Sequence, residues 1–237
     1  MRYSFALLLV AFCASLMGCS TDWVKQQVDE YRKQEQGLDS QTIVAGLKQA
    51  LEIGSERAAG TLGRVDGYLS NPPVHIPVPD QLKRAEGLLR KLGASKYADQ
   101  FVISLNRAAE TAAPKAKPIF VDVIRNMTIE DAIAILRGKD DAATQYFRRH
   151  SQDRLTVIFR PVVARTTEDV GATAYYKRFV QKAASTGLVD TRGLDLDDYV
   201  TRKALDGLFY MLAQEERRIR QDPIARTTEL LRQVFGS

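Results

Sequence analysis

The stretch LDDYVTRKALDGLFYMLAQEERRIRQ, residues 196–221, decides the fold of this chain. Its apolar and small residues recur three or four positions apart, which places them on one face of a helix. The acids of Asp195-Leu196-Asp197-Asp198 start that helix, where the helix dipole favours negative charge. The pattern predicts one long helix to about Gln221, with a buried face formed by Tyr199, Val200, Ala204, Gly207, Leu208, Met211, Leu212 and Ile219.

The same helical spacing extends over residues 40–237, in segments separated by glycine and proline. Further helices are expected after Ser40, at 80–93, 97–112, 118–127, 128–138, 142–150, 153–169, around 175–180, and after Asp222-Pro223. Residues 65–79 hold four prolines and predict an extended loop. We therefore expect an all-α fold, a compact bundle of about eight to ten helices, in a single domain of residues 40–237.

One run leaves its secondary structure open. Residues 155–159 read Leu-Thr-Val-Ile-Phe, a β-branched sequence typical of a strand. A lone strand would have no partner for its backbone hydrogen bonds, so we favour a helix over 153–169 with a kink at Pro161.

The amino-terminal residues have the pattern of a lipoprotein signal peptide. Arg2 is followed by the continuous apolar run Phe5 to Phe12, which is too short to span a membrane. Leu16-Met17-Gly18-Cys19 then resembles a bacterial lipobox, with the small Gly18 before the cysteine. Residues 1–18 are thus predicted to be cleaved, and Cys19 is predicted to carry the lipid.

Lipid attachment would place the protein at a membrane without embedding it. Residues 19–39 are polar and predict a tether, although a short amphipathic helix also fits residues 21–39. By resemblance to other bacterial lipoproteins, Ser20 favours the outer membrane on its periplasmic side over retention in the inner membrane. Since the chain has only two cysteines, Cys13 and Cys19, the mature body would contain no thiol. Disulfides, thiolate nucleophiles and cysteine metal sites are therefore excluded in that body.

The charge and the motifs narrow the function further. The net charge of +5 becomes +4 without Arg2, since 33 basic residues remain against 29 acidic ones; this mild excess suits anionic surfaces and does not indicate nucleic acid. The two histidines, His75 and His150, have no metal-binding spacing, and no nucleophile elbow, P-loop or dinucleotide fingerprint is found. We expect no metal and no cofactor, and the sequence leans away from an enzyme.

Two groups of residues are candidate sites. Polar residues on two consecutive predicted helices could pair in a polar cleft, where Arg107 would hold an anion beside Glu110 or Asp122 as acid or base; the alternative is a structural network or solvent exposure. Bulky residues of three predicted helices could line an apolar groove for a lipid, or form core. The polar group is Asn106, Arg107, Glu110, Asp122 and Arg125, and the apolar group is Tyr146, Tyr175, Tyr176, Phe179, Phe209 and Met211.

Four blocks of the sequence resemble a known family. They are Asn106-Arg107-Ala108-Ala109-Glu110, residues 113–120 (APKAKPIF), residues 140–149 (DDAATQYFRR) and residues 195–200 (DLDDYV). These blocks resemble the bacterial domain of unknown function family 4197, over roughly residues 42–236. The resemblance implies a helical, usually exported domain, and it implies no catalytic residues.

Three functions remain as hypotheses. The leading one is a non-enzymatic envelope lipoprotein whose body binds an envelope protein or helps to maintain the envelope. The second is a carrier or sensor of lipid-like ligands, and the third is a hydrolase that acts on an envelope polymer through carboxylates.

Overall fold

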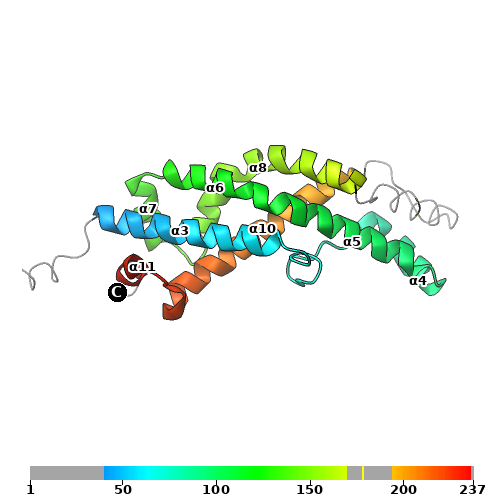
Figure 1. Cartoon of the computed structure of the whole chain (residues 1–237), viewed down its shortest axis with the longest axis horizontal. Helices are drawn as coiled ribbons and strands as arrows, with labels where there is room; N and C mark the ends of the chain where they lie inside the picture. Colours follow the sequence, from blue (N-terminus) through cyan, green and yellow to red (C-terminus); the bar gives the residue numbers. More distant parts are fainter. Residues whose placement is uncertain (1–39, 170–177, 179–193, 236–237) are drawn as a thin grey trace, which may run out of the picture. The chain divides into compact units, whose positions relative to one another are not determined.

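A computed structural model of the chain describes residues 40–169, 178 and 194–235, which lie in a compact unit that spans Ser40–Ser237 (Figure 1). This described part contains helices and no β-strand, so the all-α prediction is confirmed. The α-helices are α3 (Ser40–Leu62), α4 (Lys83–Lys91), α5 (Ser95–Ala112), α6 (Ala116–Arg125), α7 (Ile129–Arg137), α8 (Ala142–Asp169), α10 (Leu196–Gln221) and α11 (Glu229–Phe235). Short 3₁₀ helices are η1 (Asp80–Leu82), η2 (Ala113–Lys115) and η3 (Pro223–Ala225).

Helix α10, with α3 and α8, makes most of the packing contacts in the described part of the fold. It packs most extensively against α8, and then against α3 and α5. Ala143 near the start of α8 contacts Glu216 near the end of α10, whereas Arg160 contacts Asp195 just before α10, so the two helices run antiparallel. The predicted start is confirmed, because the Asp195 side chain accepts a hydrogen bond of 2.9 Å from the Asp198 amide.

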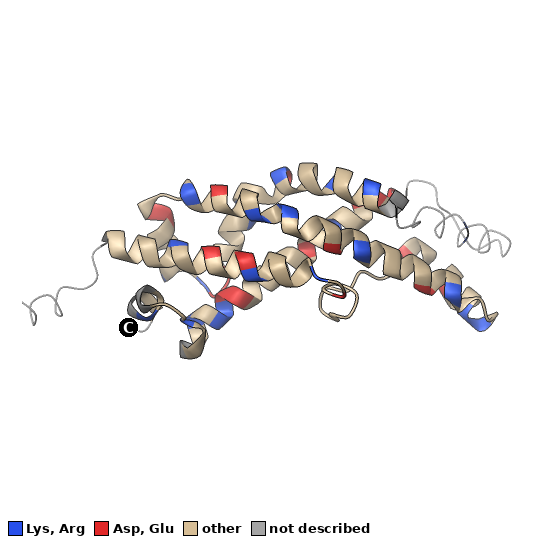
Figure 2. Cartoon of the chain, in the orientation of Figure 1, with Lys and Arg blue, Asp and Glu red and all other residues tan. Residues whose placement is uncertain are grey.

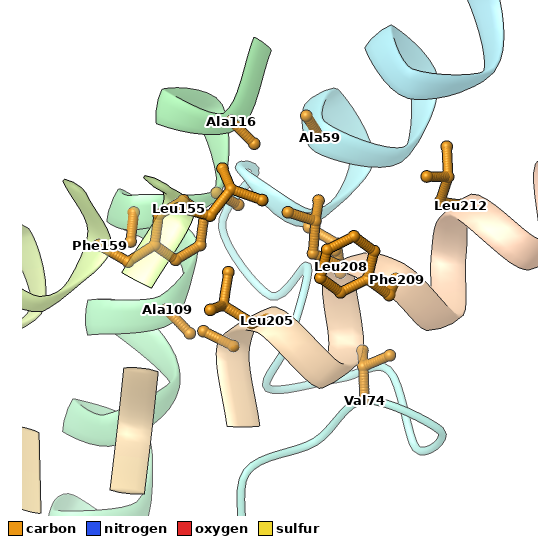
Figure 3. Packing of buried hydrophobic residues seen from close by; sticks show 14 of the residues in the cluster. Ala59, Val74, Ala109, Ala116, Leu155, Phe159, Leu205, Leu208, Phe209 and Leu212 are labelled. Atoms are coloured by element: carbon orange, nitrogen blue, oxygen red, sulfur yellow. The ribbon is translucent and has the colours of Figure 1, made fainter. Parts of the chain in front are cut away.

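The core forms where α10 meets α5, α6 and α8 (Figure 3). The ring of Phe120 on α6 lies 4.9 Å from that of Phe147 on α8 and 6.4 Å from that of Phe209 on α10, both edge-on. Edge-on contact is a favourable geometry for aromatic rings, and each buried ring adds a large apolar area. On the predicted face of α10, Tyr199 and Met211 are half-buried and the other residues are buried: Val200, Ala204, Gly207, Leu208, Leu212 and Ile219.

The described residues form fewer separate helical segments than the eight to ten helices predicted for the domain. Because α5, η2 and α6 follow one another without a break, the described residues form six uninterrupted helical segments of nine or more residues, fewer than eight to ten. The sequence interpretation ended a helix at Pro114, but this proline lies in the first turn of η2, where its missing N–H is not needed. It also separated residues 142–150 from 153–169, which both belong to α8.

Residues 155–159 lie inside α8, so the helical alternative is confirmed for this run. Pro161 lies within the 28 residues of the helix and removes the hydrogen bond to the carbonyl of Val157. Both residues are exposed, so water can satisfy that carbonyl. No helix of the described residues is long and apolar enough to cross a membrane.

The helix ends also follow local sequence signals. Thr128-Ile129-Glu130-Asp131 has the sequence pattern of a capping box, and Thr128 and Asp131 form this box at the start of α7 through two hydrogen bonds of 3.1 Å. Gly93 has a φ of +74° in the turn after α4, which favours glycine. After α10, residues 223–225 form only η3 and α11 begins at Glu229, so the predicted terminal helix is divided.

Candidate functional site

The polar residues of α5 hold the segment between α3 and η1, residues 63–79, against the helices. Asn106 is fully buried, and its side chain accepts a hydrogen bond of 2.9 Å from the Ile76 amide. Its Nδ2 donates to the carbonyl oxygens of Ile76 and Val102, at 2.9 and 2.8 Å. Asn106 therefore satisfies a buried backbone that has no helical or strand partner of its own.

Glu110 and Arg107 hold the beginning of the same segment. The buried Glu110 carboxylate accepts from the amides of Tyr68 and Leu69 through Oε1, at 3.1 and 3.2 Å. Its other oxygen, Oε2, lies 2.6 Å from Nη1 of Arg107, whose Nη2 lies 2.7 Å from the Asp66 carboxylate. The hydrogen bond with Glu110 raises the pKa of Arg107, and the bond with Asp66 adds to this effect. Both oxygens of Glu110 are thus engaged within the fold.

Tyr68 connects this polar group to α10. Its fully buried hydroxyl donates a hydrogen bond of 2.7 Å to the carbonyl of Ala204. Burial, with a smaller contribution from the Glu110 carboxylate, raises the pKa of Tyr68 far above its ordinary value. A Cβ atom on Gly207 would lie 2.7 Å from the Tyr68 ring, so α10 needs a glycine where the ring crosses it.

Asp122 and Arg125 have other partners. Oδ2 of Asp122 lies 2.7 Å from Nη1 of Arg154 on α8, and Oδ1 accepts from Asn126. Arg125 is exposed, and its carbonyl accepts a hydrogen bond from Lys48. Asn106, Arg107 and Glu110 therefore lie together against residues 66–76. Asp122 instead binds Arg154 and Asn126, and the Arg125 carbonyl binds Lys48.

Most of the proposed apolar groove that the structure describes is core. Tyr146 and Phe209 are buried, and Met211 is half-buried with its sulfur 3.9 Å from Nδ2 of Asn71. Tyr175, Tyr176 and Phe179 lie outside the described residues.

Asp131 gives the α7 cap a measurable acid dependence. The hydrogen bond from the Thr128 amide lowers the pKa of this carboxyl. Its stabilising contribution is therefore complete above its unfolded pKa, about 4, and is lost as the pH falls through the lower folded value. We expect the free energy of unfolding of Asp131→Asn, measured with urea, to fall less steeply at acid pH than that of the wild type. The neighbouring exposed Glu130→Gln is the control, and an equal change in both variants would contradict the assignment.

A second buried ionic group, on α10, was missed by the sequence interpretation. Oε1 of Glu216 accepts from the Ala143 amide, and Oε2 accepts from the Thr144 amide, each at 2.9 Å. Arg220 lies 3.0 Å from Glu216 and donates to the carbonyl of Ile135 at 2.8 Å. One pair thus binds the start of α8 and the end of α7. The sequence does contain a signal for this group. Glu216 lies on the same helical face as the apolar Leu212 and Ile219, and this position predicts a buried carboxylate that needs partners.

A small apolar pocket adjoins this pair. It lies between α3, α10 and Phe235 of α11, and its cavity volume is about 20 Å³, close to what one water molecule requires. Its lining residues are Leu47, Ala50, Leu51, Gly54, Ala143, Leu212, Glu216, Ile219, Arg220 and Phe235.

The histidines and acids do not converge on a metal site within the described residues, where no group of three or more candidate ligands is found. Nδ1 of His75 lies 2.9 Å from the carbonyl of Leu69, and the ring of His150 lies 4.3 Å from that of Tyr146. Each histidine has a local structural contact.

The chain was compared with known proteins. The model of a family described as "Protein of unknown function (DUF4197)" matches residues 37–236. No curated protein and no solved structure matches the chain. Since the family model spans most of the sequence, this chain belongs to the DUF4197 family of proteins of unknown function.

Proposed function

We propose that this protein is an exported bacterial lipoprotein, anchored through Cys19 on the periplasmic side of the outer membrane, with a helical body that acts by binding. The observation that carries the anchor is Leu16-Met17-Gly18-Cys19 behind a short apolar run. Several acyl chains would make the anchor stable, because one chain alone binds a membrane only marginally. Ser20 after the cysteine supports the outer membrane over the inner one.

A non-enzymatic body is supported by the partners of the polar residues. The buried side-chain oxygens of Asn106 and Glu110 accept hydrogen bonds from backbone amides of residues 68–76. Glu110 also pairs with Arg107. A general acid or base must lie within hydrogen-bond reach of the substrate atom whose proton it gives or takes. A carboxylate whose two oxygens hold the fold is poorly placed for that role, so binding of an envelope protein is the better proposal.

The lipid-carrier alternative has less support. The pocket beside Glu216 has a volume of about 20 Å³, whereas sites for small organic ligands occupy some hundreds of cubic ångströms. The described aromatic residues of the suggested groove, Tyr146 and Phe209, are occupied in packing.

The anchor is tested by metabolic labelling with palmitate. We expect Cys19→Ala to abolish labelling, because the acyl chains have no other attachment point after cleavage. Cys13→Ala is the matched control, and it should be labelled like the wild type. Retained labelling of Cys19→Ala would show that the modified residue is misplaced.

The binding role is tested by crosslinking in intact cells, followed by purification of the tagged protein. We expect the same envelope protein to be captured in independent preparations. Repeated capture of unrelated proteins only would count against a binding function.

A further inference from the structure

The turn between α4 and α5 combines an exposed leucine with positive charge. We call Lys91, Leu92 and Lys96 the cationic tip. Leu92 is 67% exposed, and both lysines are exposed. Leu92 directly follows α4 and Lys96 lies in the first turn of α5, so the turn at Gly93 brings them together. Figure 2 shows Lys and Arg gathered at this turn.

The acids near the tip pair with other cations. Glu86 and Asp99 both bind Arg90, at 2.8 and 2.7 Å, and Asp80 binds Lys83. Among the ion pairs of the described residues, none involves Arg84, Lys91 or Lys96. Residues 80–99 hold five basic residues against three acids, a net charge of +2, and no acid pairs with the two lysines beside Leu92.

The other exposed apolar side chains of the described residues have a different setting. Each has an acidic residue within four positions: Asp66 beside Val65, Glu130 beside Ile129, Asp153 before Val157, Asp206 before Tyr210, and Asp222 before Ile224. Leu92 has Arg90, Lys91 and Lys96 in this range and no acid. A negatively charged surface would thus meet a nearby carboxylate at each of the other sites but none within four positions of Leu92.

Helix α4 is also built to present such a face. Ala85 and Leu89 are buried, whereas Arg84, Gly87 and Lys91 are exposed on the other side. Among the described residues, α4 packs on α5 and η1, with only minor contacts elsewhere.

We propose that the cationic tip contacts a surface of anionic lipid head groups, with Leu92 entering the head-group layer. Apolar side chains enter the membrane interface, and each nearby Lys or Arg adds about 1 kcal/mol of attraction, a factor of about five. This contact is additional to the proposed acyl anchor, and it would orient the body on the membrane.

The test places an environment-sensitive fluorophore on the tip of the whole protein. Leu92→Cys is purified as processed by cells, labelled, and mixed with vesicles of equal parts phosphatidylglycerol and phosphatidylcholine or of phosphatidylcholine alone. We expect a blue shift and quenching by spin-labelled lipid with the anionic vesicles only, reversed by high salt. Ile224→Cys, on an apolar residue that is 87% exposed and follows Asp222, should show neither effect.

Charge variants test the cause. In the labelled protein, Lys91→Gln and Lys96→Gln should each lower the ratio of inserted to exposed label about fivefold, and Lys115→Gln, on another exposed lysine, should leave it unchanged. Equal shifts in both vesicle types, or equal effects of all three substitutions, would overturn the proposal. Absence of a shift together with crosslinking of the tip to an envelope protein would assign it to a protein partner instead. Palmitate labelling tests the acyl anchor on Cys19 separately, so failure of the anchor can be distinguished from failure of the lipid contact at the cationic tip.

Discussion

Glu216→Ala is expected to lower the free energy of unfolding by about 3–5 kcal/mol, because it removes one partner of a buried ion pair. The amides of Ala143 and Thr144 would lose their acceptor at the start of α8, and the guanidinium of Arg220, 13% exposed, would lose its carboxylate. Urea unfolding followed by circular dichroism measures the change through the midpoint at constant slope.

Asp206, which lies on the same helix, provides the control for this prediction. Its carboxylate is 63% exposed and lies 3.8 Å from Arg148, so its ion pair is long and on the surface. We expect Asp206→Ala to change the free energy of unfolding by no more than about 1 kcal/mol. If Asp206→Ala and Glu216→Ala were equally destabilising, the group around Glu216 would not have the role assigned to it.

Glu110→Ala is expected to lower the free energy of unfolding by about 2–4 kcal/mol, because one buried and one partly buried amide donor and a guanidinium lose a common acceptor. The amides are those of Tyr68 and Leu69. We therefore also expect the substitution to speed up amide hydrogen exchange more in residues 66–76 than in the rest of the protein. Glu56→Ala is the control, since its 70% exposed carboxylate binds only the surface Lys117; a loss below about 1 kcal/mol is expected there.

Glu110→Gln separates a structural from a catalytic role. The amide oxygen can still accept from the loop, so a smaller destabilisation is expected, and cells that lack the protein should be rescued by this variant. Failure of folded Glu110→Gln to restore function, while Asn106→Ala succeeds, would favour the carboxylate hydrolase over the binding protein.

Local signals in the sequence predicted several elements correctly. The apolar spacing of residues 196–221 and the acid at Asp195 gave α10 with its start and buried face, and Thr128 with Asp131 gave the cap of α7. These features depend on neighbours within four residues, so the sequence contains them directly. The described residues form fewer separate helical segments than expected, because the breaks expected near Pro114 and between residues 150 and 153 do not occur. A proline breaks a helix only where its missing hydrogen bond is needed.

The candidate site depended on contacts between distant residues. The sequence placed Asn106, Arg107 and Glu110 on one helix and required partners for them if buried. It could not show that the partners are the backbone of Tyr68, Leu69 and Ile76, some 30 to 42 positions away, because backbone amides have no sequence signature.

The sequence by itself determined the all-α class, the central helix, the resemblance to the family and the expectation of a lipid on Cys19. Only the tertiary structure decided that Glu110 serves residues 66–76, that Asp122 instead pairs with Arg154, and that Glu216 is a buried link between helices. The physical reason is range. Periodicity, capping and targeting motifs act over a few residues, whereas the partner of a buried charge is set by which helices the whole core brings together.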